Sequence, residues 1–181
     1  TYALARIALF VALMCVAARI SVPIPFYPVP FTMQTLIVMI AGLLLSPRES
    51  FTCMAVYVAL GLIGLPVFTS GGGLGYILYP TFGYLIGMLL AAPASGLIYN
   101  KISGRFHFFK TALCSIAVCL IIHILGVAYY AFISIVVLSS PITLGALLGM
   151  FLIYLPIDAV KAAISVFLSG AVMSSLALFK K

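Results

Sequence analysis

The chain has 181 residues, of which 66% are hydrophobic and only 6% are charged. Soluble domains are roughly 45–50% apolar and about 25% charged, so the few charges here cannot cover the surface of a soluble globule. The same apolar composition excludes intrinsic disorder. The net charge of +7 does not indicate nucleic-acid binding, because the nine Lys and Arg residues form no dense stripe.

Breaks rich in proline, glycine and charge divide the chain into apolar runs. Two thirds of the chain is about 119 residues, close to the roughly 120 that six membrane-spanning helices require. The pattern predicts an all-α integral membrane bundle of six transmembrane helices in a single domain over residues 1–181. The approximate spans are 3–20, 31–46, 50–68, 81–99, 111–137 and 143–178.

Two long irregular segments separate these runs. The segment 22–30 is dense in proline, which excludes a regular helix and predicts an extended or re-entrant loop. The segment 69–80 is rich in glycine and predicts a flexible turn-rich loop. The last run is longer than one span needs, so either Pro156 kinks it or its start lies in the membrane interface.

The basic residues predict the orientation of the bundle. With the N-terminus inside, the outer side holds Arg19 alone. The inner side then holds Arg6, Arg48, Lys101, Arg105, Lys110, Lys180 and Lys181. This asymmetry follows the positive-inside rule and predicts a multi-pass membrane protein, in contact with lipid, with both termini cytoplasmic. The two irregular loops then share the outer face, as a substrate entrance or as simple connectors.

The sequence offers little for catalysis. It has two histidines and two acids, and no nucleophile is spaced near a base, so no catalytic residue is predicted. Four cysteines lie inside apolar runs without metal-ligand spacing, and no metal site is predicted. No GxxxxGK[ST] phosphate loop is present, so uphill transport would need a partner or an ion gradient.

Asp158 and Lys161 are the charges that lie deep within a span, in the sixth run. A charged side chain there is costly and usually marks a functional site that faces the bundle interior. At a spacing of three residues the two side chains share one helix face. A carboxylate accepts from N–H groups and an ammonium donates to C=O, so together they suit a cyclic urea or amide. A structural ion pair and a proton relay are the alternatives.

Gln34 and the aromatic residues around the glycine-rich loop are further candidates. Gln34 lies near the outer side, where its amide either contacts a ligand or satisfies a neighbouring helix. The aromatic residues form either an interfacial belt or the wall of a pocket for a ring-shaped ligand. They are Tyr76, Tyr79, Phe82 and Tyr84.

Other polar residues have a simpler expected role or one open alternative. Arg19 either attracts a ligand carboxylate or reaches the lipid headgroups. His123 is isolated from any acid in the sequence, and we expect a hydrogen-bonded histidine packed in the core. Glu49 is expected to pair locally with Arg48.

Ala8 and Ala12 form a small-xxx-small spacing in the first run. Such a spacing lets another helix approach closely, either within the bundle or from a separate membrane subunit.

Several segments taken in order closely resemble the BioY family, the biotin-specific substrate-binding (S) components of energy-coupling factor (ECF) transporters. They are residues 29–36 (VPFTMQTL), 41–48 (AGLLLSPR), 64–68 (GLPVF) and 80–84 (PTFGY). Asp158 and Lys161 extend the match to the last helix.

The resemblance implies the ECF S-component fold in a bacterial cell membrane, with biotin as transported substrate and no cofactor. It implies an outward-facing pocket capped by the proline-rich loop and by the loop with Gly72 and Gly73. In it, Asp158 and Lys161 hold the ureido ring.

The remaining site residues and the partners follow from the same resemblance. Gln34 and Tyr84 complete the substrate-binding set. Ala8 and Ala12 dock onto a transmembrane coupling subunit, and a pair of cytoplasmic ATPases supplies the energy. The alternatives are an S component for another vitamin and a stand-alone proton-coupled carrier.

Overall fold

The structure, a computed structural model, describes residues 2–25, 29–102, 107–140 and 142–178. For His107 and residues 175–178 it describes the backbone alone. The predictions for the centre of the proline-rich loop, Arg105, Lys180 and Lys181 therefore lie outside the described residues.

The described residues form the predicted all-α bundle, with six α-helices. Two short strands, a 3₁₀ helix and a π-helical segment connect or extend them. The helices are α1 (Tyr2–Arg19), α2 (Gln34–Leu44), α3 (Pro47–Leu62), α4 (Phe82–Lys101), α5 (His107–Phe132) and α6 (Leu144–Leu178). The other elements are β1 (Ser21–Val22), β2 (Phe31–Thr32), the 3₁₀ helix η1 (Leu74–Leu78) and the π-helical segment η2 (Ile133–Val137).

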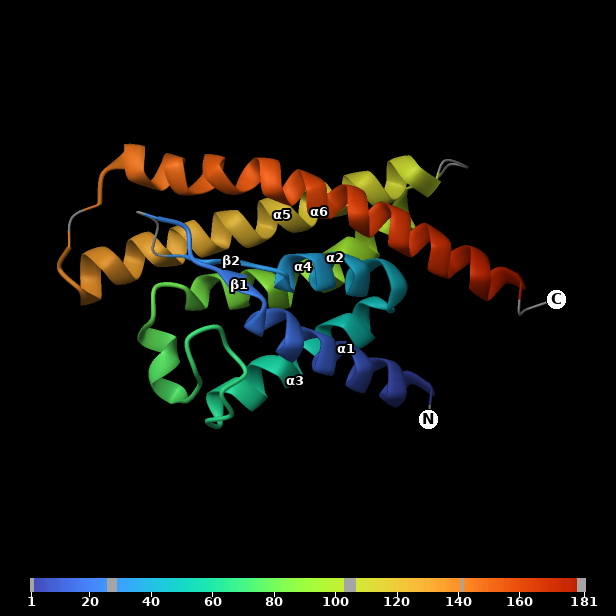
Figure 1. The fold of residues 1–181 in the computed structure, drawn as a ribbon, viewed down its shortest axis with the longest axis horizontal. Coiled ribbons are helices and arrows are strands. Elements are labelled where there is room, and N and C mark those ends of the chain that lie inside the picture. Colours follow the sequence, from blue (N-terminus) through green and yellow to red (C-terminus); the bar gives the residue numbers. More distant parts are fainter. Residues whose placement is uncertain (1, 26–28, 103–106, 141, 179–181) are drawn as a thin grey trace.

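The helices pack around α2 and α4, which lie in the middle of the bundle. α5 and α6 cover one side of this pair, and α1 and α3 cover the other (Figure 1). The two termini lie at one end of the bundle, and the strands and the long loop after α3 lie at the opposite end (Figure 1). This arrangement agrees with the predicted placement of both termini on one face and both irregular loops on the other.

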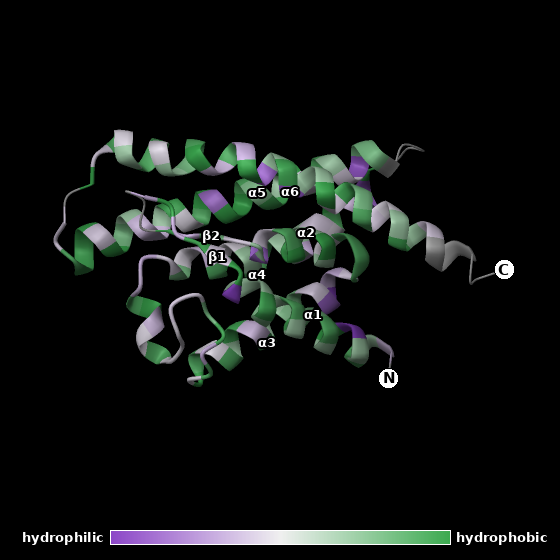
Figure 2. Cartoon of the chain, viewed as in Figure 1, coloured by the Kyte–Doolittle hydropathy of each residue, from purple (hydrophilic) through white to green (hydrophobic). Residues whose placement is uncertain are grey.

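Hydrophobic residues occupy most of the helices along their whole length, with few hydrophilic segments (Figure 2). Within the described part of the chain, four helical stretches are long and apolar enough to cross a membrane. They are Tyr2–Arg19, Phe82–Lys101, Phe108–Val137 and Leu144–Ser174. Together they make the chain a multi-pass membrane protein.

The second helix is shorter than the predicted run over 31–46. α2 has 11 residues, which measure about 16 Å, well below the roughly 30 Å hydrocarbon core of a bilayer. The helix begins at Gln34 and not at Phe31, because Phe31 and Thr32 pair with Val22 and Ser21 in an antiparallel ladder. The proline-rich segment is thus held at both ends by backbone hydrogen bonds.

The third helix begins and ends at clear local signals. Ser46 caps it, because the Ser46 hydroxyl accepts from the Glu49 N–H and the Glu49 carboxylate accepts from the Ser46 N–H. The helix ends at Leu62, close to Gly64, whose φ of 109° is a left-handed conformation that favours glycine. The prediction of a helix to residue 68 is therefore too long.

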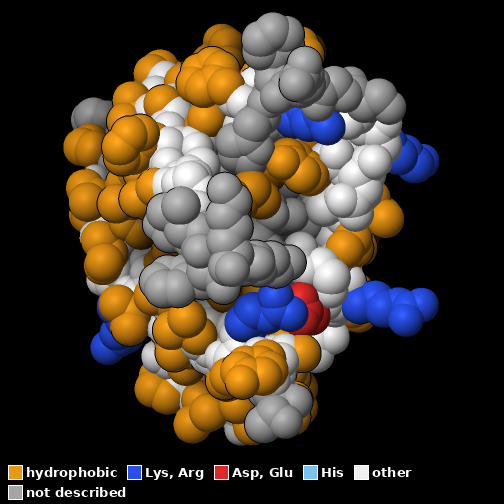
Figure 3. Space-filling view, turned by 90° about the vertical axis from the view of Figure 1, so that its right-hand side faces the viewer, with side chains coloured by type: hydrophobic (Ala, Val, Ile, Leu, Met, Phe, Trp, Pro, Cys, Tyr) orange, Lys and Arg blue, Asp and Glu red, His pale blue; other side chains and the backbone are white. Residues whose placement is uncertain are grey.

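Glu49 pairs with Arg6 of α1 at 2.5 Å, not with its neighbour Arg48 as the sequence suggested. The Ser46 backbone N–H, together with the Arg6 guanidinium, holds the pKa of the Glu49 carboxyl below its usual value. Figure 3 views this end of the bundle, where basic side chains gather around one acidic group.

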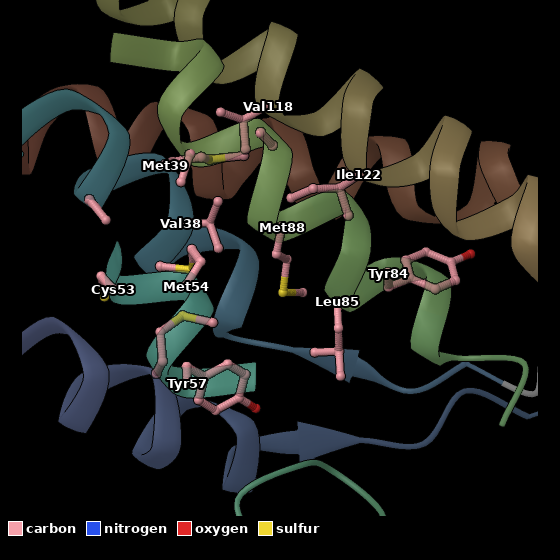
Figure 4. Close-up of a cluster of buried hydrophobic side chains, with 14 of the residues drawn as sticks. Val38, Met39, Cys53, Met54, Tyr57, Tyr84, Leu85, Met88, Val118 and Ile122 are labelled. Atoms are coloured by element: carbon pink, nitrogen blue, oxygen red, sulfur yellow. The ribbon is translucent and has the colours of Figure 1, made fainter. Parts of the chain in front are cut away.

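The core between α2, α3, α4 and α5 is rich in methionine (Figure 4). Met39, Met54 and Met88 are all buried, and unbranched methionines fill irregular gaps well. Glycines let the backbones come close. A Cβ added at Gly87 of α4 would lie 2.8 Å from the Ile122 Cα of α5, so no larger residue fits there without separating the helices.

The loop after α3 packs against the bundle through aromatic side chains. Phe68 is fully buried and packs against Gly61, where any side chain would collide with its ring. The Phe68 ring lies 4.6 Å from the Tyr76 ring, and the Tyr129 hydroxyl of α5 donates to the Ile77 carbonyl at 2.5 Å. Aromatic packing therefore fixes this loop over the outer end of the bundle.

The close approach of α4 and α5 gives a test of the packing. We expect Gly87→Ala to destabilise the protein by about 1–3 kcal/mol, because the new methyl group meets the α5 backbone. The matched control is Gly145→Ala in α6, where an added Cβ meets nothing within 4 Å. Thermal unfolding of the detergent-solubilised variants measures both, and equal melting temperatures would contradict the packing described for Gly87.

Candidate functional site

A pocket opens at the outer end of the bundle, between α2, α4, α5 and α6 and beneath both outer loops. Its wall combines aromatic rings with a few polar groups, as ligand pockets usually do. The lining residues are Val29, Pro30, Phe31, Thr32, Gln34, Thr35, Thr69, Ser70, Tyr76, Thr81, Tyr84, Leu85, Met88, Ile122, His123, Tyr154, Asp158 and Lys161.

Asp158 and Lys161 of α6 form the charged part of this wall. Their spacing on one helix face places the Lys161 ammonium 2.8 Å from Asp158 Oδ1. Both residues are buried, with exposed fractions of 3% and 4%. A buried charge needs partners, and Asp158 and Lys161 are partners of each other. The structure therefore confirms that the Asp158 and Lys161 side chains lie next to each other, as their spacing predicts.

Lys161 also connects α6 to the start of α2. Its ammonium donates to the Thr35 hydroxyl at 2.9 Å and lies 4.1 Å from the centre of the Phe31 ring. An ammonium over an aromatic face is attracted by the ring electrons. Three different groups therefore fix the direction of the Lys161 side chain, and two of them, Thr35 and Phe31, could not be predicted from the sequence.

His123 of α5 faces the second oxygen of Asp158. Its Nε2 lies 3.4 Å from Asp158 Oδ2, and its Nδ1 lies 2.9 Å from the Cys119 carbonyl of the preceding turn. We expected a packed core histidine, and the ring is buried, but it also belongs to the charged cluster. No sequence spacing could reveal this contact, because α5 and α6 meet only through the tertiary fold.

Gln34 satisfies a neighbouring helix and also lines the pocket, while its contact with a ligand stays a prediction. Its side chain lines the pocket, and its Nε2 donates to the Tyr57 hydroxyl of α3 at 2.7 Å. The Tyr57 hydroxyl in turn donates to the Val67 carbonyl at 2.9 Å. The hydrogen bond to Tyr57 thus fixes the amide of Gln34, a residue that also lines the pocket.

Tyr84 carries a polar atom that lacks a partner. Its hydroxyl is buried and makes no hydrogen bond to any of the described residues, although the ring lines the pocket. A buried hydroxyl without a partner costs roughly 1–3 kcal/mol, so the site favours a polar atom from a ligand or water here. Of the other aromatic candidates, Tyr76 also lines the pocket, whereas Tyr79 is half exposed.

The loops above the pocket are placed by contacts with the helices. The Tyr154 hydroxyl of α6 donates to the Val29 carbonyl of the proline-rich loop. Thr69 and Ser70 of the second loop reach the pocket wall.

Gly72 and Gly73 lie outside this wall, and they hold the loop against the end of α3. The Gly73 N–H donates to the Gly61 carbonyl at 2.7 Å, and a Cβ at Gly72 would meet the Gly61 carbonyl. A direct ligand contact by these two glycines stays a prediction.

The candidates on α1 lie away from the pocket. Ala8 and Ala12 are both exposed, one turn apart on the outer surface of α1. Arg19 is exposed at the end of the same helix and does not line the pocket. The alternative that the two alanines pack within the bundle is therefore wrong.

The charged cluster can bind a ligand that presents a donor and an acceptor side by side. The Asp158 carboxylate has about four lone-pair positions, of which Lys161 and His123 face only part. The Lys161 ammonium has three N–H groups, and two of them are accounted for by Asp158 and Thr35. The free capacity matches the adjacent N–H and C=O of a cyclic urea or amide.

The chain is also similar to known biotin transporters. A model of the BioY family matches residues 1–177. A probable biotin transporter BioY from Bacillus subtilis is 35% identical over 178 residues, which cover 96% of this chain and 91% of that protein. A probable biotin transporter BioY from Lysinibacillus sphaericus is 44% identical over 131 residues, which cover 71% of this chain and 64% of that protein.

Another relative matches over a shorter segment. A probable biotin transporter BioY from Pyrococcus horikoshii is 45% identical over 97 residues, which cover 53% of this chain. The matched segment spans 59% of the length of that protein, so here, as for the Lysinibacillus protein, less than two thirds of the relative is covered.

A solved structure shares the fold. The crystal structure of the S-component for biotin from an ECF-type ABC transporter superposes with a TM-score of 0.84 at 27% sequence identity. The match covers 96% of this chain and 91% of that one. From the family match over nearly its whole length, the chain belongs to the BioY family.

Proposed function

We propose that residues 1–181 work as one six-helix unit, the biotin-binding S component of an ECF-type vitamin transporter in a bacterial cell membrane. The observation that carries the proposal is the Asp158–Lys161 pair in the outward pocket of a BioY-family chain. The protein is a transport subunit and not an enzyme. Biotin is its substrate, and no cofactor is involved.

The geometry supports a specific binding mode for the ureido ring. Asp158 accepts a hydrogen bond from a ureido N–H, and Lys161 donates to the ureido oxygen. Phe31, Tyr76 and Tyr84 offer apolar rings for the bicyclic body of the ligand. The valerate chain then points toward the mouth of the pocket, near the exposed residue Ser70.

Delivery into the cell requires partners, which we propose to be a transmembrane coupling subunit and two cytoplasmic ATPases. The support on this chain is the exposed small-residue face of α1, where Ala8 and Ala12 leave room for a second helix. Without large side chains, two helix backbones can approach closely and gain many van der Waals contacts. The S component itself captures biotin and presents it to these partners.

Replacement of Asp158 tests the binding mode. We expect Asp158→Asn to lower biotin affinity by roughly 10-fold to 150-fold, because a charge-assisted hydrogen bond is lost. Isothermal titration calorimetry on the detergent-solubilised protein measures the affinity. Glu49→Gln is the control, because it removes the other acid of the chain at the far end of the bundle and should leave affinity unchanged.

The same titration shows which vitamin the protein binds. Binding of thiamine or riboflavin in place of biotin by the wild type would contradict the proposed substrate. Near wild-type biotin affinity in folded Asp158→Asn would contradict the assigned site and leave the family assignment untouched.

Tyr84 gives a prediction with opposite signs for stability and binding. Tyr84→Phe removes a buried hydroxyl that lacks a partner among the described residues, so we expect the ligand-free protein to keep or raise its melting temperature. We expect biotin affinity to fall by roughly tenfold, because one polar contact is lost. The control is Tyr57→Phe, which removes a hydroxyl bonded to Gln34 and Val67 and should lower the melting temperature.

The docking proposal is tested on α1. We expect Ala12→Phe to lower the amount of this chain that co-purifies with the coupling subunit and the ATPases. Biotin binding by the isolated S component should stay at the wild-type level. Ala146→Phe, at an exposed alanine of α6, is the matched control and should assemble normally. Equal assembly of both variants, measured by co-purification, would place the docking surface elsewhere.

A further inference from the structure

Tyr57 of α3 does not line the pocket, and its hydroxyl proton is already used. The hydroxyl donates to the Val67 carbonyl at 2.9 Å, and a carbonyl oxygen only accepts hydrogen bonds. Because a hydroxyl has a single O–H, the Tyr57 oxygen meets its other polar neighbours as an acceptor. The side chain is held in this direction, since it is 1% exposed and packs edge-on against the Phe68 ring at 5.6 Å.

This direction decides which end of the Gln34 amide faces Tyr57. A distance of 2.7 Å joins the amide to the Tyr57 oxygen, and that oxygen needs a donor. Nε2 supplies the N–H, whereas a carbonyl oxygen in its place would set two acceptors against each other in a buried site. If Tyr57 donated to Gln34 in the reverse sense, the Val67 carbonyl would lose the one donor it has among the described residues.

The oxygen of the Gln34 amide is the group left for the pocket. Gln34 lines the pocket, and within the described part of the chain its side chain makes one hydrogen bond, to Tyr57. Oε1 and Nε2 diverge from the same carbon atom, so Oε1 points away from Tyr57 when Nε2 faces it. An amide offers both donors and an acceptor, and here the donor is committed to α3 and the acceptor is free.

Gln34 lies beside the charged pair at the start of α2. The next residue, Thr35, accepts from the Lys161 ammonium at 2.9 Å, and the same ammonium contacts Asp158 Oδ1 at 2.8 Å. The groups offered to a ligand are therefore two acceptors, on Asp158 and Gln34, and one donor, on Lys161. A cyclic urea is complementary to this set, because it carries an N–H on each side of its C=O. A cyclic amide or carbamate carries one N–H.

We propose that Tyr57 is a positioning residue that holds Gln34 Oε1 as an acceptor toward the pocket, so that the site selects cyclic ureas over cyclic amides and carbamates. The inference rests on the proposed function and adds a third polar contact to those of Asp158 and Lys161. A ligand with one N–H leaves one of the two acceptors without a donor, and a buried acceptor without a partner is costly. A site of this kind rejects the analogue that lacks the N–H.

Tyr57 also has a structural role, which the experiment has to separate from the positioning role. Through Val67 it holds the loop after α3, and Thr69 and Ser70 of that loop line the pocket. A change in the loop alters affinity whether or not the Gln34 amide is present. A positioning effect requires that amide, so the two roles differ in their coupling to Gln34.

A double-mutant cycle measures this coupling. Isothermal titration calorimetry on the detergent-solubilised protein gives the biotin affinity of the wild type, Tyr57→Phe, Gln34→Met and the double variant. We expect Gln34→Met to bind roughly tenfold more weakly, because one hydrogen bond is lost, and Tyr57→Phe roughly fivefold more weakly, because the amide is no longer oriented. In the Gln34→Met background, Tyr57→Phe should change the affinity by less than about twofold.

Tyr129→Phe is the matched control for the loop. The Tyr129 hydroxyl donates to the Ile77 carbonyl of the same loop, and Tyr129 does not line the pocket. Any effect of Tyr129→Phe on affinity should be equal in the wild-type and the Gln34→Met backgrounds. If the effect of Tyr57→Phe is likewise equal in both backgrounds, the positioning role is overturned.

Two cyclic carbamate analogues of biotin, each with oxygen in place of one ureido N–H, test the selection. We expect the wild type to bind each analogue at least about tenfold more weakly than biotin. In Gln34→Met the penalty for one analogue should shrink to less than about threefold, while the other keeps its full penalty at Asp158. Tyr57→Phe should reduce the same penalty in part. Full penalties for both analogues in Gln34→Met, or the loss of both, would overturn the assignment of Gln34 as the second acceptor.

The remaining outcomes also decide the question. If Tyr57→Phe fails to fold, Gln34→Glu takes its place, because a carboxylate keeps an acceptor for the ligand and has no N–H. Stronger biotin binding by Gln34→Glu than by Gln34→Met supports the acceptor, and equal or weaker binding overturns it. A wild type that binds both carbamates as tightly as biotin overturns the inference and leaves the biotin site in place. A wild type that binds no biotin overturns the proposed function itself.

Discussion

The contact between Asp158 and Lys161 is the constraint on which the rest of the structure depends. Two charges that are buried within a membrane bundle are tolerated only where the fold supplies partners for both of them. Thr35, Phe31 and His123 are those partners, and they come from α2, β2 and α5. The short second helix, the strand before it and the histidine of the fifth helix are therefore placed by the same electrostatic requirement.

Much of this molecule could be predicted because a membrane simplifies the problem. Apolar runs must become helices, prolines and glycines must fall between them, and basic residues must collect on one face. Asp158 stood out from the sequence for the same reason, since an acid inside a span is rarely without function. Ala8 and Ala12 were found by their spacing, and their exposure on α1 agrees with a docking role.

The sequence failed where non-local contacts decide the conformation. Phe31 and Thr32 read as the start of a helix, but pairing with β1 holds them extended. Phe68 read as part of a helix, but it lies beyond the end of α3, where its ring fills the space beside Gly61. Glu49 has Arg48 beside it in the chain, yet Arg6 is closer in space. None of these outcomes follows from periodicity or composition.

The length of α6 has a consequence for how such a bundle sits in a bilayer. Its apolar stretch Leu144–Ser174 has 31 residues and measures about 46 Å, against a hydrocarbon core of roughly 30 Å. A helix of this length is fully immersed only when it is inclined by roughly 50° to the membrane normal. At smaller inclinations part of its apolar surface leaves the lipid. Hydrophobic mismatch at α6 thus lowers the cost of tilting the whole bundle, and the lipid itself favours an inclined bundle.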